Sequence, residues 1–150
     1  MRSVLHVRNT AEGAEAINRW REGYDNDFEA RMDWTLTSNY ADANHHPIAV
    51  VNGDTSRHVL EISASAGSSV VLSADGSSDP DGDGLVHSWS FYDEPSSYEG
   101  SVSIEGNSSA LATVRVPSNA GGQSIHVILQ LRDDGAPNLS AYRRVIVDVR

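Results

Sequence analysis

The spacing of apolar residues along the chain changes from a helical period to a strand period near residue 46. In the first part of the chain, bulky apolar side chains recur at every third or fourth position: Ile17, Trp20, Tyr24, Phe28 and Met32. This spacing places them on one face and predicts an amphipathic helix over roughly residues 10–32. A stripe with this much aromatic surface needs a partner, so we expect it to pack against another part of the protein or a second copy.

Short runs of alternating apolar and polar residues fill the rest of the chain and predict β-strands. Turns rich in Gly, Ser, Asp and Pro separate the runs. The runs cover residues 48–54, 58–64, 69–74, 85–93, 101–104, 111–116, 125–131 and 143–149, and the first of them is a short strand that ends in an Asn-Gly turn. About seven such strands in about 100 residues are typical of an all-β, immunoglobulin-like antiparallel sandwich. We therefore expect a helix and linker in residues 1–45 and one β-sandwich in residues 46–150.

Composition excludes several classes of function. The formal net charge is −10 and the sequence pI is about 4.8, and an acidic surface repels nucleic acids and anionic membranes. The chain has no cysteine, which excludes disulfides, thiol catalysis and thiolate metal sites. No run approaches the roughly 20 apolar residues that a membrane helix needs. Residues 1–10 lack the apolar stretch of a signal peptide.

Two separated motifs resemble immunoglobulin-like domains of the PKD type. The first is Gly-Ser-Ser-Asp-Pro-Asp-Gly-Asp-Gly-Leu-Val-His-Ser-Trp at residues 76–89, where an aspartate-rich turn leads into a strand bearing Trp89. The second combines Asp-Asp-Gly at residues 133–135 with Arg-Arg-Val-Ile-Val at residues 143–147. The resemblance implies that Trp89 lies in the core of the sandwich.

A narrower resemblance covers almost the whole chain. Its motifs occur in the family's order at residues 20–34, 43–47, 51–53, 125–129 and 137–146. They resemble the C-terminal immunoglobulin-like domain, and the junction before it, of bacterial cellulose-binding proteins with an N-terminal nucleoside-hydrolase-like domain. The resemblance implies that this chain is the C-terminal part of a longer exported protein, periplasmic or extracellular, with the signal peptide missing from this fragment. The helix would then belong to the preceding domain.

Alternating aspartates form the most distinctive polar motif. Asp79, Asp81 and Asp83 precede Gly84, and such a row of carboxylates resembles the start of a calcium loop. The glutamate that a complete loop would carry is replaced by Ser90. The alternative interpretation is that these carboxylates accept backbone N–H bonds and order the turn. Both interpretations stay open, and calcium is the one cofactor that the sequence suggests.

Aromatic side chains are the natural candidates for sugar binding, because a ring stacks on the apolar face of a sugar. The candidates outside the expected core are Trp34, Tyr40, Tyr92 and Tyr98. Tyr142, beside the last strand, is expected to be structural. Trp20 and Trp34 also suit a simpler role, in which they pack the helix onto the sandwich or onto the preceding domain.

No catalytic constellation is found in the sequence. There is no Gly-x-Ser-x-Gly motif, and the adjacent His45 and His46 diverge on an extended chain. With the family resemblance, this indicates a non-catalytic module that binds a polysaccharide, cellulose, or acts as an accessory to its binding. The alternative is a structural domain that packs on a nucleoside-hydrolase-like domain, or that makes such a domain dimeric through the helix.

Overall fold

The computed structural model describes residues 15 and 17–150, and the chain divides into two compact units, Met1–Ala43 and Asn44–Arg150. The sequence pattern placed this division two residues later, between residues 45 and 46. The first unit contains helix α2 (Arg21–Leu36) and the short 3-10 helix η1 (Tyr40–Asp42). The second unit contains all seven strands.

Helix α2 is stabilised by local side-chain pairs. Arg31 Nε lies 2.7 Å from Asp27 Oδ2, and Arg21 pairs with Asp25 at 3.5 Å, both at the favourable spacing of four residues. The helix ends at Thr37, whose extended backbone still donates its N–H to the Asp33 carbonyl. It therefore runs four residues beyond the predicted end at Met32. The predicted start, residue 10, lies outside the described residues.

The aromatic stripe of α2 is exposed in the structure. Within the helix only Ala30 is buried. The side chains of the stripe have exposed fractions of 48% for Tyr24, 66% for Phe28 and 49% for Met32. The helix forms as predicted. These three side chains of the stripe are exposed, whereas the sequence pattern leads one to expect them to be packed.

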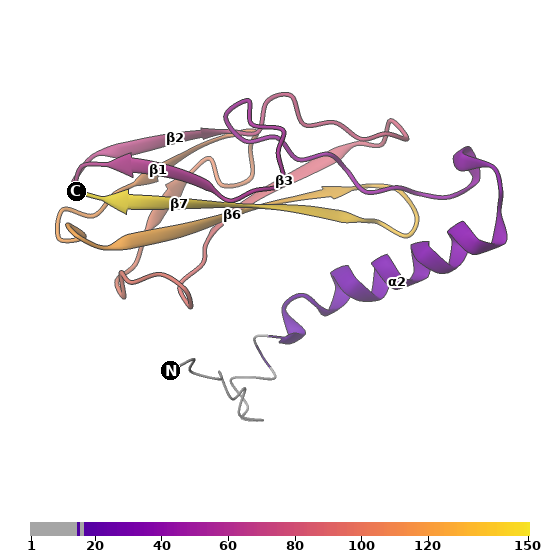
Figure 1. The fold of residues 1–150 in the computed structure, drawn as a ribbon, viewed down its shortest axis with the longest axis horizontal. Coiled ribbons are helices and arrows are strands. Elements are labelled where there is room, and N and C mark those ends of the chain that lie inside the picture. Colours follow the sequence, from indigo (N-terminus) through magenta and orange to yellow (C-terminus); the bar gives the residue numbers. More distant parts are fainter. Residues whose placement is uncertain (1–14, 16) are drawn as a thin grey trace. The chain divides into compact units, whose positions relative to one another are not determined.

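The strands form two sheets that face each other. In chain order they are β1 (Leu60–Ala64), β2 (Ser69–Ser73), β3 (Leu85–Phe91), β4 (Ser103–Glu105), β5 (Leu111–Arg115), β6 (Ser124–Asp133) and β7 (Ser140–Val149). One sheet has the order β1-β7-β6-β3 and the other β2-β5-β4. The long hairpin of β6 and β7, drawn from orange to yellow in Figure 1, occupies the centre of the larger sheet. The expected immunoglobulin-like β-sandwich with a preceding helix is confirmed.

Alternating side chains from both sheets fill the core. Alternate residues of the two long strands, β6 and β7, point inward and are fully buried: Ile125, Val127, Leu129, Leu131, Val145 and Val147. Ala112 and Val114 face them from β5, and Trp89 lies among them with 2% of its surface exposed. Its indole Nε1 donates to the Ser109 carbonyl at 3.0 Å, so the buried polar end of the ring is satisfied.

Two expectations about the strands were wrong. The sandwich is not wholly antiparallel, because β1 pairs with β7 in parallel. Residues 48–54 do not form a strand and make only isolated bridges. The reason is a tight turn at Asn52 and Gly53, both with positive φ, which folds this segment back on itself. The backbone N–H of Asn52 then donates to the carbonyl of Ser73, at the end of β2, and the side-chain oxygen of Asn52 accepts the backbone N–H of Ser73.

Candidate functional site

The aspartates of the alternating motif converge in the loop between β2 and β3. Asp79 Oδ1 accepts the backbone N–H groups of Asp81 and Asp83, at 2.8 and 3.3 Å, so the loop curls around this carboxylate. Gly82 has a φ of +85°, which suits glycine and lets the chain turn. As a result, one carboxylate oxygen from each of the three aspartates lies within 4.8 Å of the others.

Two further carboxylates reach the same loop from the end of β6. Asp134 Oδ1 accepts the backbone N–H of Gly84 at 2.7 Å. Asp133 has only 2% of its surface exposed, and its Oδ1 accepts three bonds, from Asn44 Nδ2, Gly135 N and Leu139 N. We call Asp79, Asp81, Asp83, Asp133 and Asp134 the acidic cluster. The sequence motif could not reveal the last two, because about 50 residues separate them from the loop.

The start of the second unit completes the surroundings of the acidic cluster. The Asn44 amide is buried and donates to both Asp133 Oδ1 and the Pro137 carbonyl, at 3.1 and 2.8 Å. The backbone N–H of His45 donates to Asp81 Oδ2 at 2.7 Å. The Nδ1 atom of the His45 imidazole lies 3.2 Å from both oxygens of the Asp81 carboxylate. Three segments that are distant in sequence therefore meet around these five aspartates.

The charges of the acidic cluster reinforce one another at Asp83. Partial burial raises the pKa of its carboxyl group, and the negative charges of Asp79, Asp133, Asp134 and Asp81 raise it further. Every cause acts in the same direction, so the charged form of Asp83 is disfavoured. Both earlier interpretations of the motif remain: the carboxylates do order the turn through backbone bonds, and their grouping also suits a hard cation.

The aromatic candidates differ in their exposure. Tyr98 was wrongly expected to lie outside the core. It is 8% exposed, belongs to the core, and donates its hydroxyl to Asn119 Oδ1 at 3.1 Å. Its ring fits there because Gly100 has no side chain: a Cβ at that position would lie within 2.8 Å of the ring. A ring buried in this way is not available to stack on a sugar.

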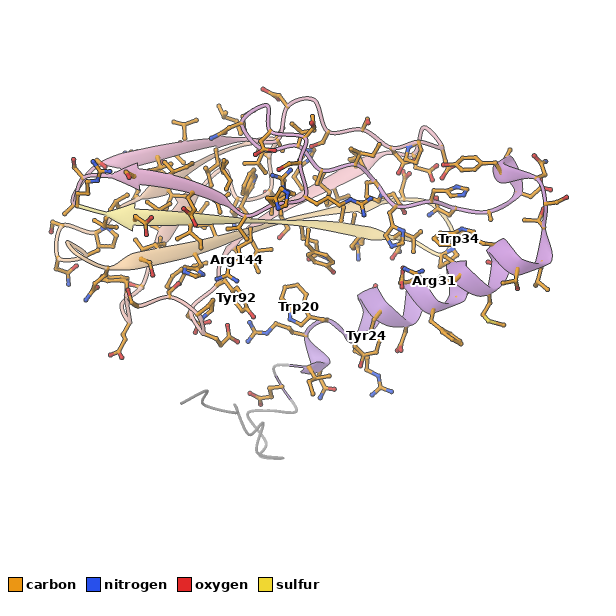
Figure 2. The ribbon with its side chains drawn as sticks, in the orientation of Figure 1. Trp20, Tyr24, Arg31, Trp34, Tyr92 and Arg144 are labelled. Carbon is orange, nitrogen blue, oxygen red and sulfur yellow. The ribbon has the colours of Figure 1, made fainter. Side chains whose placement is uncertain are left out.

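The other three candidates belong to different units. Trp34 is half-buried on α2, and the Arg31 guanidinium carbon lies 5.6 Å from its ring centroid. Both side chains are labelled on the helix in Figure 2. Tyr40, in η1, is 60% exposed. Tyr92 is half-buried in the sandwich unit, just after β3, where its backbone N–H donates to the His126 carbonyl.

Sequence reasoning missed an exposed aromatic residue on the outer face of the larger sheet. Tyr142 was expected to be structural, yet it is 42% exposed. Its register partner is Gln130, whose Nε2 donates to the Tyr142 hydroxyl at 3.3 Å, and the partner of Gln130 on β3 is Ser88. We call Ser88, Gln130 and Tyr142 the polar row. The two-residue period of the strand could have predicted the exposure of Tyr142, because this residue is out of phase with the apolar Val145, Val147 and Val149.

Beside the polar row lies a buried histidine. His126 is 6% exposed, and its Nδ1 accepts a hydrogen bond from Arg144 Nε at 3.1 Å. Burial and the neighbouring Arg144 charge lower the pKa of this imidazole, with Asp148 opposing. Tyr92 and Arg144 lie on the same side of the sandwich in Figure 2. The imidazole is therefore a neutral acceptor held by a guanidinium, an arrangement suited to structure or recognition.

In the part of the chain that the structure describes, no helix is long and apolar enough to cross a membrane.

Comparison with known proteins identifies a specific relative. A nucleoside hydrolase-related hypothetical protein from Saccharophagus degradans, described as associated with carbohydrate metabolism, is 60% identical and superposes with a TM-score of 0.88. The match covers 89% of this chain and 33% of the other. The chain thus spans about a third of the length of that protein.

A second solved structure is only weakly similar. The PKD domain of the KIAA 1837 protein is 22% identical, with a TM-score of 0.42 over 61% of this chain and 81% of that domain. No curated protein matches the sequence. The family model that does match, over residues 69–149, is described as the C-terminal domain of cellulose-binding protein Sde0182. This match takes in more than half of the chain, from β2 to β7, and the chain therefore belongs to that family.

Proposed function

We propose that this chain is a non-catalytic module that binds a polysaccharide, cellulose, or assists its binding within a longer exported protein. The observation that carries the proposal is the family match over residues 69–149, because the name of that family refers to a cellulose-binding protein. The relative associated with carbohydrate metabolism supports the same class of ligand. An exported location, periplasmic or extracellular, follows from the proposal, since cellulose is an insoluble polymer outside cells. Fractionation of the producing cells tests the location: recovery in the cytoplasm alone would contradict it.

The polar row is the surface that best suits a sugar chain. It offers an aromatic ring, an amide and hydroxyl groups across three adjacent strands, from Ser88 through Gln130 to Tyr142. Adjacent strands lie about 4.8 Å apart, so the row is about 10 Å long. A flat row of this length can contact two linked sugar rings, with the ring of Tyr142 stacking on one and the amide bonding to hydroxyl groups of the other.

Sedimentation with microcrystalline cellulose tests the proposal. The intact chain is expected to partition into the pellet, and Tyr142→Ala is expected to weaken the partition about 3- to 10-fold, the usual contribution of one aromatic contact. Val71→Ala is the matched control, because Val71 is 54% exposed on the other sheet. Full recovery of the unmodified protein in the supernatant would contradict the binding function. Equal losses for both variants would contradict the location of the site.

The exposed stripe of α2 supports a second candidate function, a structural role toward a nucleoside-hydrolase-like domain. Tyr24, Phe28 and Met32 expose about half or more of their surfaces, which is unusual for large apolar side chains on one helix face. The Saccharophagus relative has two thirds of its length outside the matched region. We expect the stripe to pack on such a domain or on a second copy.

Light scattering tests this second candidate. If the stripe mediates self-association, the chain is expected to be dimeric, and Phe28→Ser is expected to shift it toward the monomer. If the stripe packs on a preceding domain, Phe28→Ser in a protein of the relative's full length is expected to lower the melting temperature. A monodisperse monomer together with an unchanged melting temperature would contradict both forms.

A further inference from the structure

We propose that the acidic cluster binds one Ca²⁺ ion, which joins the β2–β3 loop, the end of β6 and the segment at Asn44 into one rigid end of the sandwich. This site is separate from the polar row and does not rest on the proposed carbohydrate binding. Asp79, Asp81 and Asp83 supply its first three oxygens, and the carboxylates that follow from β6 supply the rest.

The separation of the oxygens fits the size of the ion. Calcium binds six to eight oxygens at about 2.3–2.6 Å, so two ligands on opposite sides of the ion are about 4.8 Å apart. One oxygen each from Asp79, Asp81 and Asp83 lies within that distance of the other two. The three can therefore contact a single calcium ion with little movement of the loop.

Buried oxygens without hydrogen-bond partners point independently to a cation. Asp133 is 2% exposed, and its Oδ1 accepts three hydrogen bonds, but its Oδ2 is buried and accepts none from residues 15 and 17–150. In Asp79, Oδ1 likewise accepts bonds from the loop, whereas Oδ2 is buried and has no hydrogen-bond donor in the same described part of the chain. A buried carboxylate oxygen that lacks a partner is costly and calls for an explanation. A bound cation would satisfy both oxygens.

Asp133 lies close to the motif through the Asn44 amide. A Cβ on Gly135 would lie within 2.5 Å of both Asp83 Oδ2 and the side-chain amide of Asn44. That amide is in turn hydrogen-bonded to Asp133 Oδ1, and the negative charge of Asp133 acts on Asp83. Asp133 is therefore near enough to the loop to contribute to the proposed site.

The charge of the acidic cluster requires compensation. Five carboxylates meet here, and the neighbours of Asp83 all disfavour its negative charge. His45 Nδ1 lies 3.2 Å from Asp81 Oδ1, and this contact is an ion pair only when the imidazole is protonated. A divalent cation reverses the balance, because each carboxylate then gains an attraction instead of a repulsion.

The donor set favours calcium over other common metals. Zinc prefers nitrogen and sulfur ligands in a tetrahedron, whereas these side chains supply oxygens. Magnesium needs near-ideal octahedral geometry at about 2.0–2.1 Å, which loosely spaced loop carboxylates do not provide. The glutamate that the motif lacks is no obstacle. Ser90 lies within β3 and cannot reach back, but Asp133 and Asp134 approach from the other side of the loop.

Calcium titration and thermal unfolding of the full chain test the site. With calcium about 100-fold above its dissociation constant, we expect the melting temperature to rise by roughly 10 °C relative to EDTA, and calorimetry to show one site per chain. Asp83→Asn is the informative variant, because among the described residues no hydrogen bond is donated to that carboxylate. Asp75→Asn is the matched control, since Asp75 is an exposed aspartate of the same loop outside the acidic cluster.

The variants separate a cation site from a turn ordered only by backbone bonds. If calcium binds, Asp83→Asn keeps or raises the melting temperature in EDTA, because it removes repulsion, and it loses the response to calcium. The Asp75 variant keeps that response. Extracellular calcium sites have dissociation constants of about 0.1–1 mM. Absence of any shift in melting temperature or any binding heat at about 10 mM calcium, roughly tenfold above the weakest of these constants, would overturn the proposal. An equal shift with magnesium would overturn the assignment to calcium.

Discussion

The two units of this protein acquire their structure in opposite ways. Helix α2 depends on pairs four residues apart, such as Arg31 with Asp27, and buries only Ala30. The sandwich depends on contacts across the whole sequence, from the core packing of Leu129 to the bond between Asn44 and Asp133. The difference teaches that the sandwich can be stable by itself, because it buries its own core. The large apolar side chains of the helix are exposed, and we expect them to pack on another surface.

Truncation of a core leucine should give the largest effect. Leu129→Ala, at a fully buried position in β6, is expected to lower the free energy of unfolding by about 3 kcal/mol, from lost burial and the resulting cavity. Leu36→Ala removes the same atoms from α2, where Leu36 is 82% exposed, and should change it by less than about 0.5 kcal/mol. Urea unfolding measures both. Similar losses would break the contrast between the units.

The next largest effect should come from a buried arginine. Arg143 is 4% exposed, and its guanidinium donates to the carbonyls of Ala49, Asp54 and His58. It thereby holds the irregular segment before β1 against the sheet. Arg143→Met keeps much of the packing but removes all three of these hydrogen bonds, at a cost of about 2 kcal/mol. Proteolysis that begins in residues 49–58 of the variant would sharpen the contrast. An unchanged urea midpoint would show that the packing alone holds the segment.

A smaller effect should appear on mild acidification. Burial and Arg144 lower the pKa of His126 in the folded state, so below the ordinary histidine pKa of about 6.5 the unfolded chain binds the proton more readily. This contribution to stability is present above that pH and is lost as the pH falls below it. Melting temperatures between pH 7.5 and 5 measure the loss. It should be smaller in His126→Gln, and an identical pH profile would contradict the assignment.

Acidification also acts on the acidic cluster, in the opposite sense. The pKa of Asp83 is raised in the folded state, so its protonation as the pH falls favours the folded chain. The His126→Gln variant is therefore needed to separate the two groups. Calcium in the buffer would suppress the contribution of Asp83, if the proposed site is correct, and would leave that of His126 unchanged.

The smallest effect on stability should come from the helix stripe. Phe28→Ser, at a position that is 66% exposed, is expected to change the free energy of unfolding of the isolated chain by less than about 0.5 kcal/mol. The melting temperature of the sandwich measures it. A loss above 2 kcal/mol would mean that the stripe already contributes to the stability of this chain, and the contrast between the units would fail.

The sequence predicts the regular parts of the sandwich because each strand carries its own signal. Alternation from Ile125 to Leu131 is enough to assign the central strand and its inward face, since the side-chain period of a strand is two. The same rule fails at residues 48–51, where apolar residues are present but only isolated bridges form. The Asn-Gly turn predicted after them does form, with positive φ at Asn52 and Gly53.

The candidate sites were harder to predict because they depend on contacts between distant segments. The alternating aspartates were visible as a motif, but no local pattern links them to Asp133, which reaches them only through the pairing of β3 with β6. Tyr98 was misjudged because its burial depends on the space above Gly100. Tyr142 was misjudged although the sequence places it out of phase with the apolar Val145 and Val147 of the same strand.

The parallel pairing of β1 with β7 has a mechanical consequence. The ladder joins Leu60–Ala64 to residues 145–149, and Arg150 extends it through bonds with Ala64 and Ala66. A force applied between the start of β1 and the end of β7 pulls these strands along their length in opposite directions. All hydrogen bonds of the ladder are then loaded together in shear and must break nearly at once. A domain tethered to an insoluble fibre at one end and to a moving partner at the other would resist tension best in this arrangement.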